Sequence, residues 1–95
     1  MKAEPLIRER VVYADGAFVE MIVWRLPQPS RASRHRFKYR LAYVVSGRRA
    51  LGYDNERGKG DHRHVGDREE PFTFSSIEEL LARFTSEVEA LRRQE

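Results

Sequence analysis

The chain has 95 residues, no cysteine and a formal net charge of +3 at pH 7. A chain of this length forms a single domain with one modest core, and it is too short for a deep cofactor cleft between lobes. The absence of cysteine excludes disulfide bonds, thiolate metal sites and a cysteine nucleophile. No signal peptide and no apolar run of membrane-spanning length is evident, so we expect a cytoplasmic protein without a membrane partner.

The first third of the sequence predicts a β-hairpin. Residues 6–14 and 18–26 are rich in strand-forming side chains, and Asp15-Gly16 between them suits a type I′ turn. The second of these strands is apolar at both parities over residues 18–24. This pattern predicts that both faces of the strand are covered, one by a helix and the other by a partner or a second copy of the chain.

Residues 36–45 predict a third strand. Arg36, Lys38 and Arg40 occupy one parity, and the other parity carries Phe37, Tyr39, Leu41, Tyr43 and Val45. This is the pattern of a half-buried strand with a cationic outer face. The tyrosines are expected in the core, and the alternative is that Tyr39 or Tyr43 stacks on a base. After a turn at residues 46–47, residues 48–54 are expected to return as a fourth strand.

Positive charge is concentrated in the middle of the chain. No acidic residue lies between Glu20 and Asp54, a stretch with eight cations. A block of one sign favours polyanions through counterion release. The alternative is a solvated face balanced by the glutamates of the C-terminal helix. We therefore predict nucleic-acid contacts from six cations, namely Arg36, Lys38, Arg40, Arg48, Arg49 and Arg63.

Residues 52–64 combine glycines, carboxylates, cations and two histidines. Histidine exchanges protons near neutral pH, and Lys and Arg bind phosphate. In extended backbone His62 and His64 share a face, with Cα atoms roughly 6.5–7 Å apart, and Arg63 points the other way. Metal-free RNA cleavage needs a general base, a general acid and cations that stabilise the phosphate. The candidate catalytic residues are His62, His64, Lys59, Arg57 and Asp54.

Two other interpretations of this segment stay open. Imidazole and carboxylate ligands suit a divalent metal such as Zn²⁺ or Mn²⁺, and the candidate ligands are Asp54, Asp61, His62 and His64. Otherwise residues 56–70 are a hydrated charged loop in which the histidines have no role. Metal-free chemistry is the favoured hypothesis, with no cofactor.

The C-terminal segment predicts an amphipathic helix over residues 76–93. Ser76 and Glu79 fit a capping box, and apolar residues follow at helical spacing up to Leu91. Arg92 and Arg93 lie at the negative end of the helix dipole. The whole sequence therefore predicts a single α+β domain. It contains a four-stranded antiparallel meander, or a five-stranded one if residues 72–74 add a strand, packed by this helix.

The segment from residue 52 to about residue 91 resembles the TumE family of small toxins from bacterial toxin–antitoxin pairs. The resemblance rests on Tyr53-Asp54-Asn55 followed by His62-x-His64, and then on residues 68–72 and a short helix. It implies a cytoplasmic toxin partnered by a helix-turn-helix antitoxin. With the residue chemistry, it leads to the hypothesis of a toxin that acts on RNA as a small metal-independent endoribonuclease.

Two further hypotheses compete with this one. The chain could be a non-catalytic module that binds nucleic acid or protein through the basic sheet face, or a metal-dependent nuclease. A homodimer is a further expectation, because of the doubly apolar second strand.

Overall fold

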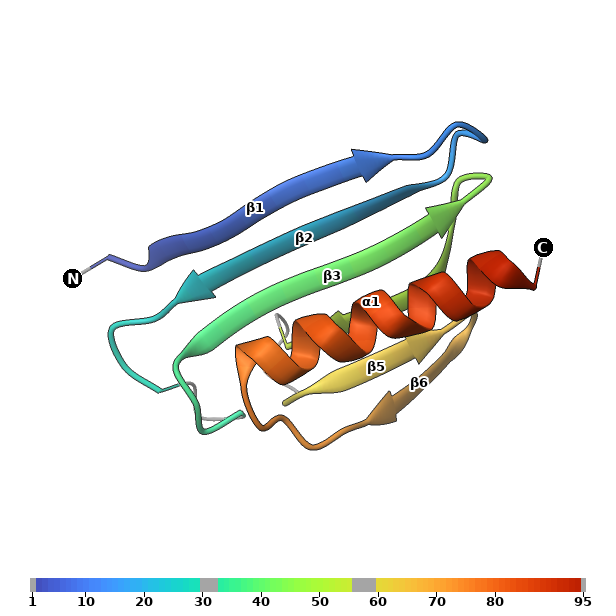
Figure 1. The fold of residues 1–95 in the computed structure, drawn as a ribbon. Coiled ribbons are helices and arrows are strands. Elements are labelled where there is room, and N and C mark those ends of the chain that lie inside the picture. Colours follow the sequence, from blue (N-terminus) through green and yellow to red (C-terminus); the bar gives the residue numbers. More distant parts are fainter. Residues whose placement is uncertain (1, 30–32, 56–59, 95) are drawn as a thin grey trace.

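A computed structural model describes residues 2–29, 33–55 and 60–94. These residues form a six-stranded antiparallel sheet in which every strand pairs with the next along the chain, and one C-terminal helix lies across one face (Figure 1). The elements are β1 (Glu4–Val12), β2 (Phe18–Arg25), β3 (Phe37–Val45), β4 (Arg48–Asp54), β5 (His62–Val65), β6 (Arg68–Pro71) and α1 (Ile77–Arg93).

The predicted α+β class and the meander are confirmed, but the predicted number of strands is wrong. Residues 62–71, expected as part of a charged loop, form the β5–β6 hairpin, with Gly66 at positive φ in its turn. Among the described residues of this hairpin, Val65 is the one that packs against the core, and the charged residues around it lack the alternation that marks a half-buried strand. Residues 72–74 are not a strand. They are an irregular segment in which Phe72 and Phe74 pack against the core.

The β1–β2 hairpin forms as expected, with a longer turn than predicted. The Tyr13 backbone N–H donates to the Ala17 carbonyl at 2.8 Å, so residues 14–16 form the loop. Gly16 adopts φ of 88°, and an Asp15 carboxylate oxygen accepts from the Ala17 N–H at 3.0 Å. Three-residue hairpin loops that end with a left-handed glycine are the common alternative to the two-residue type I′ turn.

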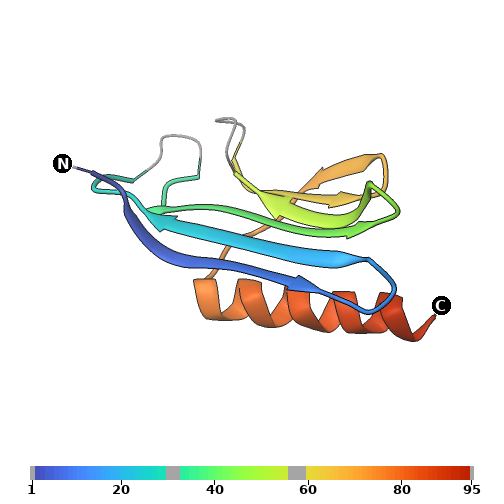
Figure 2. The same cartoon turned by 90° about the horizontal axis from the view of Figure 1, so that it is seen from above.

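The sheet and α1 form two layers, as Figure 2 shows from above, and the core lies between them. Tyr39, Tyr43 and Tyr53 are at most 1% exposed and belong to the same core cluster as the apolar stripe of α1, formed by Leu80, Phe84 and Val88. The prediction that the tyrosines belong to the core is confirmed, and stacking of Tyr39 or Tyr43 on a base is wrong because both rings are buried.

The helix begins and ends where the sequence predicts. The Ser76 side chain caps it by accepting from the Glu79 backbone N–H at 3.1 Å, and Arg92 and Arg93 occupy the last turn. The capped end satisfies an N–H group that has no partner inside the helix. Among the described residues, no helix is both long and apolar enough to span a membrane.

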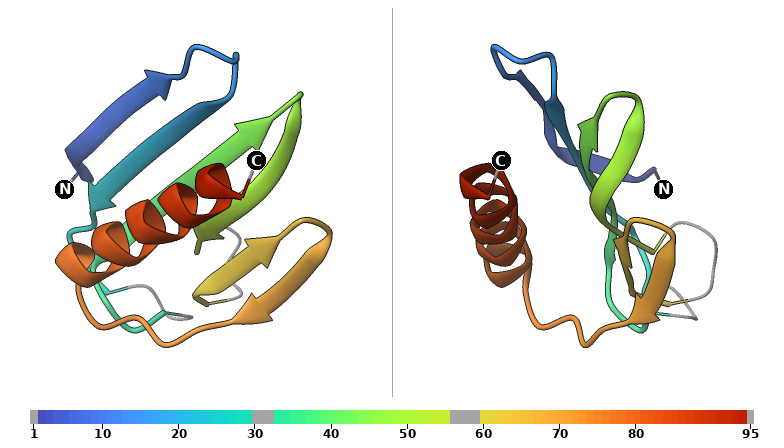
Figure 3. Two further views of the ribbon diagram at one scale, coloured as in Figure 1. Left: turned by 45° about the vertical axis from the view of Figure 1, so that its right-hand side comes forward. Right: turned by 90° about the vertical axis from the view of Figure 1, so that its right-hand side faces the viewer.

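The helix packs over β3 and β4 and leaves much of the β1–β2 hairpin uncovered, as the two views in Figure 3 show. On the face opposite α1, the apolar side chains of β2 are only half-buried. The structure contains one chain, so the expected cover of this face of β2 by a partner or a second copy stays a prediction.

Candidate functional site

The sheet face opposite α1, here called the open face, carries the even-numbered side chains of β2, β3 and β5. Strand register places Arg40 beside Asp54, and Asp54 beside His62. Neighbouring strands lie about 4.7–4.9 Å apart. One row across the open face therefore contains a guanidinium, a carboxylate and an imidazole.

The next row has a floor of small residues. Ala42 lies beside Gly52, and Gly52 beside His64. The Arg49 side chain passes over this floor, because a Cβ atom built on Gly52 would lie 2.8 Å from Arg49 Cδ. The Arg49 guanidinium then reaches Asp54, with a nitrogen to oxygen distance of 3.6 Å. Glycine at position 52 thus lets Arg49 lie flat on the open face.

His62 is held in one tautomer. Its Nδ1 lies 3.0 Å from the Gly60 carbonyl oxygen, and a carbonyl can only accept, so Nδ1 carries the proton and donates. Nε2 of the neutral ring then has a free lone pair, 3.8 Å from a carboxylate oxygen of Glu69. The side chain is 17% exposed. His62 can accept a proton at Nε2, and Glu69 is close enough to stabilise the resulting imidazolium.

His64 is placed differently, although it shares a face with His62. Its Nε2 lies 3.0 Å from an Asp54 carboxylate oxygen. The direction of this contact does not suit a hydrogen bond, and Nε2 is buried without a hydrogen-bond partner among the described residues. The two groups are therefore in contact without a directed hydrogen bond, and Nε2 of His64 is closed to solvent.

Arg63 faces α1, as its parity predicts. Its guanidinium donates to the Glu87 carboxylate, to Glu70 at 2.8 Å and to the Tyr53 hydroxyl at 3.1 Å. Tyr53 also donates to Glu87. The hydrogen bond to Glu87 is the main cause that raises the pKa of Arg63, and burial, followed by the bond to Glu87, raises the pKa of Tyr53 to about 12. The predicted nucleic-acid contact of Arg63 thus lies across the sheet from the open face.

Asp61 also lies away from the two histidines of the open face. One of its carboxylate oxygens accepts from the Tyr39 hydroxyl at 2.6 Å and from His35 Nε2 at 2.9 Å. The Phe37 backbone N–H donates to His35 Nδ1, so Nε2 carries the proton, and the His35 ring stacks on Phe74 at 3.9 Å. Burial is the main cause that raises the pKa of Tyr39.

The candidate metal ligands are therefore divided. Asp54, His62 and His64 lie on the open face, and Asp61 binds the core tyrosine Tyr39. Among the described residues, no group of three or more His, Asp or Glu side chains is placed to hold a metal ion. The proposed donor set does not fit a metal site as arranged here.

Of the other predicted cations, Lys38 and Arg40 lie on the open face, whereas Arg48 pairs with Val45, a residue of the face toward α1. Lys38 is beside Trp24 in the sheet, Arg40 contacts Glu20 at 3.2 Å, and Arg48 is exposed at the β3–β4 turn. Arg36 lines a shallow hollow at the end of the sheet together with Arg25. Arg57 and Lys59 lie outside the described residues.

Three residues that take part in the contacts described above could not be identified from the sequence. His35 stands in a polar stretch, and Glu69 and Glu87 belong to charged segments that read as solvated. Each becomes recognisable only when its neighbour on another element is known. Of these contacts, the sequence could have suggested only the one between Arg63 and the acidic side of the helix, because strand alternation places Arg63 on the face opposite His62 and His64.

The fold and the two faces define a small α+β protein whose open sheet face carries cations, a carboxylate and two imidazoles. A family model described as Toxin TumE matches residues 2–92. The chain belongs to the TumE toxin family, and membership of a toxin family indicates an antitoxin partner. No curated protein and no solved structure matches the chain.

Proposed function

We propose that this TumE-family toxin acts on RNA as a small metal-independent endoribonuclease, with the scissile phosphate bound on the open face. The observation that carries the proposal is the His62 imidazole, held by Gly60 in the tautomer that leaves Nε2 free to accept a proton. It lies in the same strand row as Arg40. A base of suitable tautomer and a cation on the same face are two of the three requirements of metal-free RNA cleavage, and solvent can supply the proton of the general acid.

The reaction follows from these groups. His62 Nε2 removes the proton of a ribose 2′-hydroxyl, and the 2′-oxygen forms a bond to phosphorus. The bond from phosphorus to the 5′-oxygen breaks, and that oxygen takes a proton from solvent. The products are a 2′,3′-cyclic phosphate and a 5′-hydroxyl, and Glu69 stabilises the imidazolium while it exists.

Arg40 and Arg49 supply the positive charge. Their side chains are 48% and 36% exposed, and each contacts a carboxylate, Glu20 and Asp54 respectively. An exposed ion pair of this kind contributes little to stability. A phosphate can therefore share or replace the carboxylate, and a guanidinium suits the non-bridging oxygens of the transition state.

A second candidate function is a non-catalytic nucleic-acid-binding face. Trp24 lies beside Lys38 on the open face, and an aromatic ring next to a cation is a platform for an unstacked base and its phosphate. This function needs no proton transfer, so it makes no demand on His62.

The decisive experiment is cleavage of labelled RNA by purified protein in the presence of EDTA. Replacing His62 by Ala should reduce the rate by about 10²–10⁴ with unchanged melting temperature and RNA affinity. His64→Ala should have a smaller effect, because its Nε2 is buried.

Three results would contradict the proposal. Cleavage that EDTA abolishes and Zn²⁺ or Mn²⁺ restores would establish metal chemistry. Unchanged cleavage or growth arrest by the His62→Ala/His64→Ala variant would remove both histidines from the mechanism. Binding of RNA without any cleavage would leave only the second candidate function.

A further inference from the structure

β1 leaves one edge of the sheet open. Among the described residues it pairs only with β2, and nearly all of its side chains are exposed. Leu6, Val11 and Val12 are 45%, 46% and 63% exposed. A long apolar edge strand is a template for pairing with another chain, and proteins usually protect such edges with prolines or bulges. In β1, Pro5 and the only register shift lie at the beginning, so residues 7–12 contain neither a proline nor a bulge, and a pairing strand has to meet only the charges of Arg8, Glu9 and Arg10.

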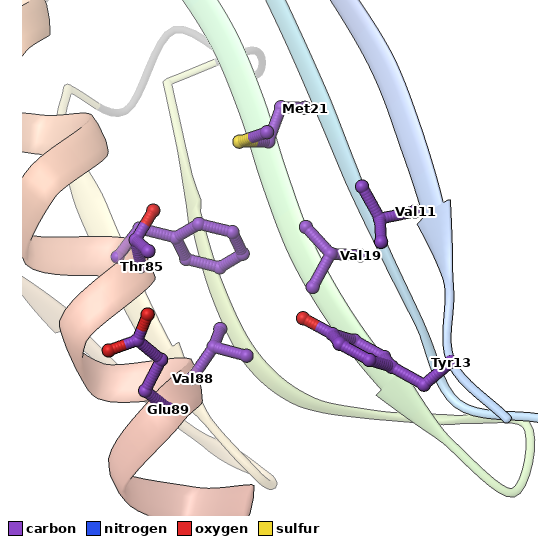
Figure 4. Close-up of a pocket in the computed structure, with 8 residues that line it drawn as sticks. Val11, Tyr13, Val19, Met21, Thr85, Val88 and Glu89 are labelled. Carbon is purple, nitrogen blue, oxygen red and sulfur yellow. The ribbon is translucent and has the colours of Figure 1, made fainter. Parts of the chain in front are cut away.

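A pocket opens beside this edge, between α1 and the β1–β2 hairpin (Figure 4). Its volume is about 150 Å³, and its lining is Val11, Tyr13, Val19, Met21, Phe84, Thr85, Val88 and Glu89. Small-molecule sites are usually about 300–1,000 Å³. A cavity of this smaller size fits a benzene-sized group, so it suits one apolar side chain of a protein partner.

The charges of β1 specify what can pair with it. Arg8 and Arg10 project on the open face, since their strand partners are Ile22 and Glu20, and Val11 projects toward the pocket. Side chains directly opposite each other on antiparallel strands interact, and opposite charges are favourable. The complementary strand therefore has two carboxylates at alternate positions, opposite Arg8 and Arg10, and an apolar side chain opposite Val11 on its other face.

A second copy of β1 does not meet this requirement. In antiparallel pairing of two identical strands, a register centred on Arg8 places Arg8 opposite Arg8. A register centred on Glu9 places Arg8 opposite Arg10, and one centred on Arg10 places Arg10 opposite Arg10. Like charges directly opposite each other are destabilising. Registers centred on Ile7 and on Val11 avoid these contacts, but the first leaves Val11 and the pocket beyond the paired residues, and the second pairs only residues 10–12 of each strand.

We propose that an extended segment of the antitoxin adds to the free edge of β1 as a further strand. Its alternating carboxylates face Arg8 and Arg10, and one apolar side chain enters the pocket beside Val11. Main-chain hydrogen bonds supply affinity in this mode of recognition, and the side chains supply specificity. The proposal rests on family membership and on the geometry of β1, and it is independent of the RNA chemistry proposed above.

The first test titrates the purified cognate antitoxin against variants of the purified toxin. Arg8→Glu and Val11→Asp should each weaken binding by about tenfold or more. Arg68→Glu is the matched control, because Arg68 is an exposed arginine on β6, the strand at the opposite edge of the same sheet. It should bind as the wild type does. Wild-type affinity of both β1 variants, or an equal loss in the control, would overturn the proposal.

A second test in cells separates loss of binding from loss of folding. Val11→Asp should still arrest growth and should no longer be rescued by the antitoxin at the level that rescues the wild type. If Val11→Asp does not arrest growth, hydrogen exchange of the wild-type complex decides. Amides of residues 7–12 that exchange rapidly in the free toxin should be protected in the complex. Unchanged exchange there, or protection already present in a dimer of the free toxin, would overturn the proposal.

Discussion

Tyr53, Arg63 and Glu87 form a polar network between the sheet and α1. Glu87 accepts from the Arg63 guanidinium and from the Tyr53 hydroxyl, and Arg63 is also bound to Glu70. A carboxylate in this half-buried position is stable because both partners donate to it. Removing Arg63 should therefore affect folding more than RNA binding. Removing Lys38, an exposed residue of the open face, should instead affect RNA binding more than folding.

The Tyr53 pKa predicts a loss of stability in alkali. Burial raises this pKa from 10.0 to about 12, so the folded protein holds the phenolic proton more tightly than the unfolded chain. The stabilisation of the folded state that results from this tighter binding of the proton is complete below pH 10 and is lost as pH rises toward 12. In urea unfolding, Tyr53→Phe should be about 1 kcal/mol less stable than wild type at pH 8. It should also lose less stability between pH 10 and 12, and parallel curves would contradict this assignment.

Gly52 determines how the Arg49 side chain lies along β4. A Cβ at position 52 would lie 2.8 Å from Arg49 Cδ and 3.2 Å from the Leu41 carbonyl oxygen. Gly52→Ala should therefore displace Arg49 from Asp54 and destabilise the protein by about 1–3 kcal/mol in urea unfolding. The Gly52→Ala/Arg49→Ala pair should recover most of this loss. Strictly additive effects of the two changes would mean that the side chains do not meet.

α1 is the element that closes the core. Phe84 is 1% exposed and packs edge-on against the Tyr53 ring at 6.3 Å. Phe84→Ala should lower the free energy of unfolding by about 3–5 kcal/mol, measured by urea denaturation. Ser86→Ala, on the exposed side of the same helix, should change it by about 0.5 kcal/mol or less. An unchanged melting temperature of Phe84→Ala would show that this helix face does not bury the core.

The excess positive charge of the whole molecule predicts that RNA binding depends on salt concentration. The logarithm of the association constant should fall linearly with the logarithm of salt concentration, and Lys38→Gln should reduce the slope by about 1. Arg93→Gln removes the same charge from the exposed end of α1, away from the open face, and should leave the slope nearly unchanged. Equal slopes for both variants would show that RNA binds through diffuse charge, without a defined contact to Lys38.

Short sequence patterns were enough to predict a strand or a helix wherever its formation depends on a few neighbouring residues. The alternation of residues 36–45 predicted a strand with its tyrosines in the core, and Ser76 with the apolar spacing after it predicted the limits of α1. Both predictions hold because strand and helix periods depend on successive side chains meeting one apolar surface. The β5–β6 hairpin lacks such a signal, since its faces are satisfied by charges on other elements.

Periodicity in the sequence is therefore enough to predict the fold class, the helix, the core aromatics and the opposite facing of His62 and Arg63. Only the tertiary structure decided that Arg49 and His64 meet at Asp54, that Asp61 leaves the histidines to bind Tyr39, and that β1 has an open edge. These relations depend on strand register and order. Register is set by hydrogen bonds between residues distant in sequence, so no local pattern contains it.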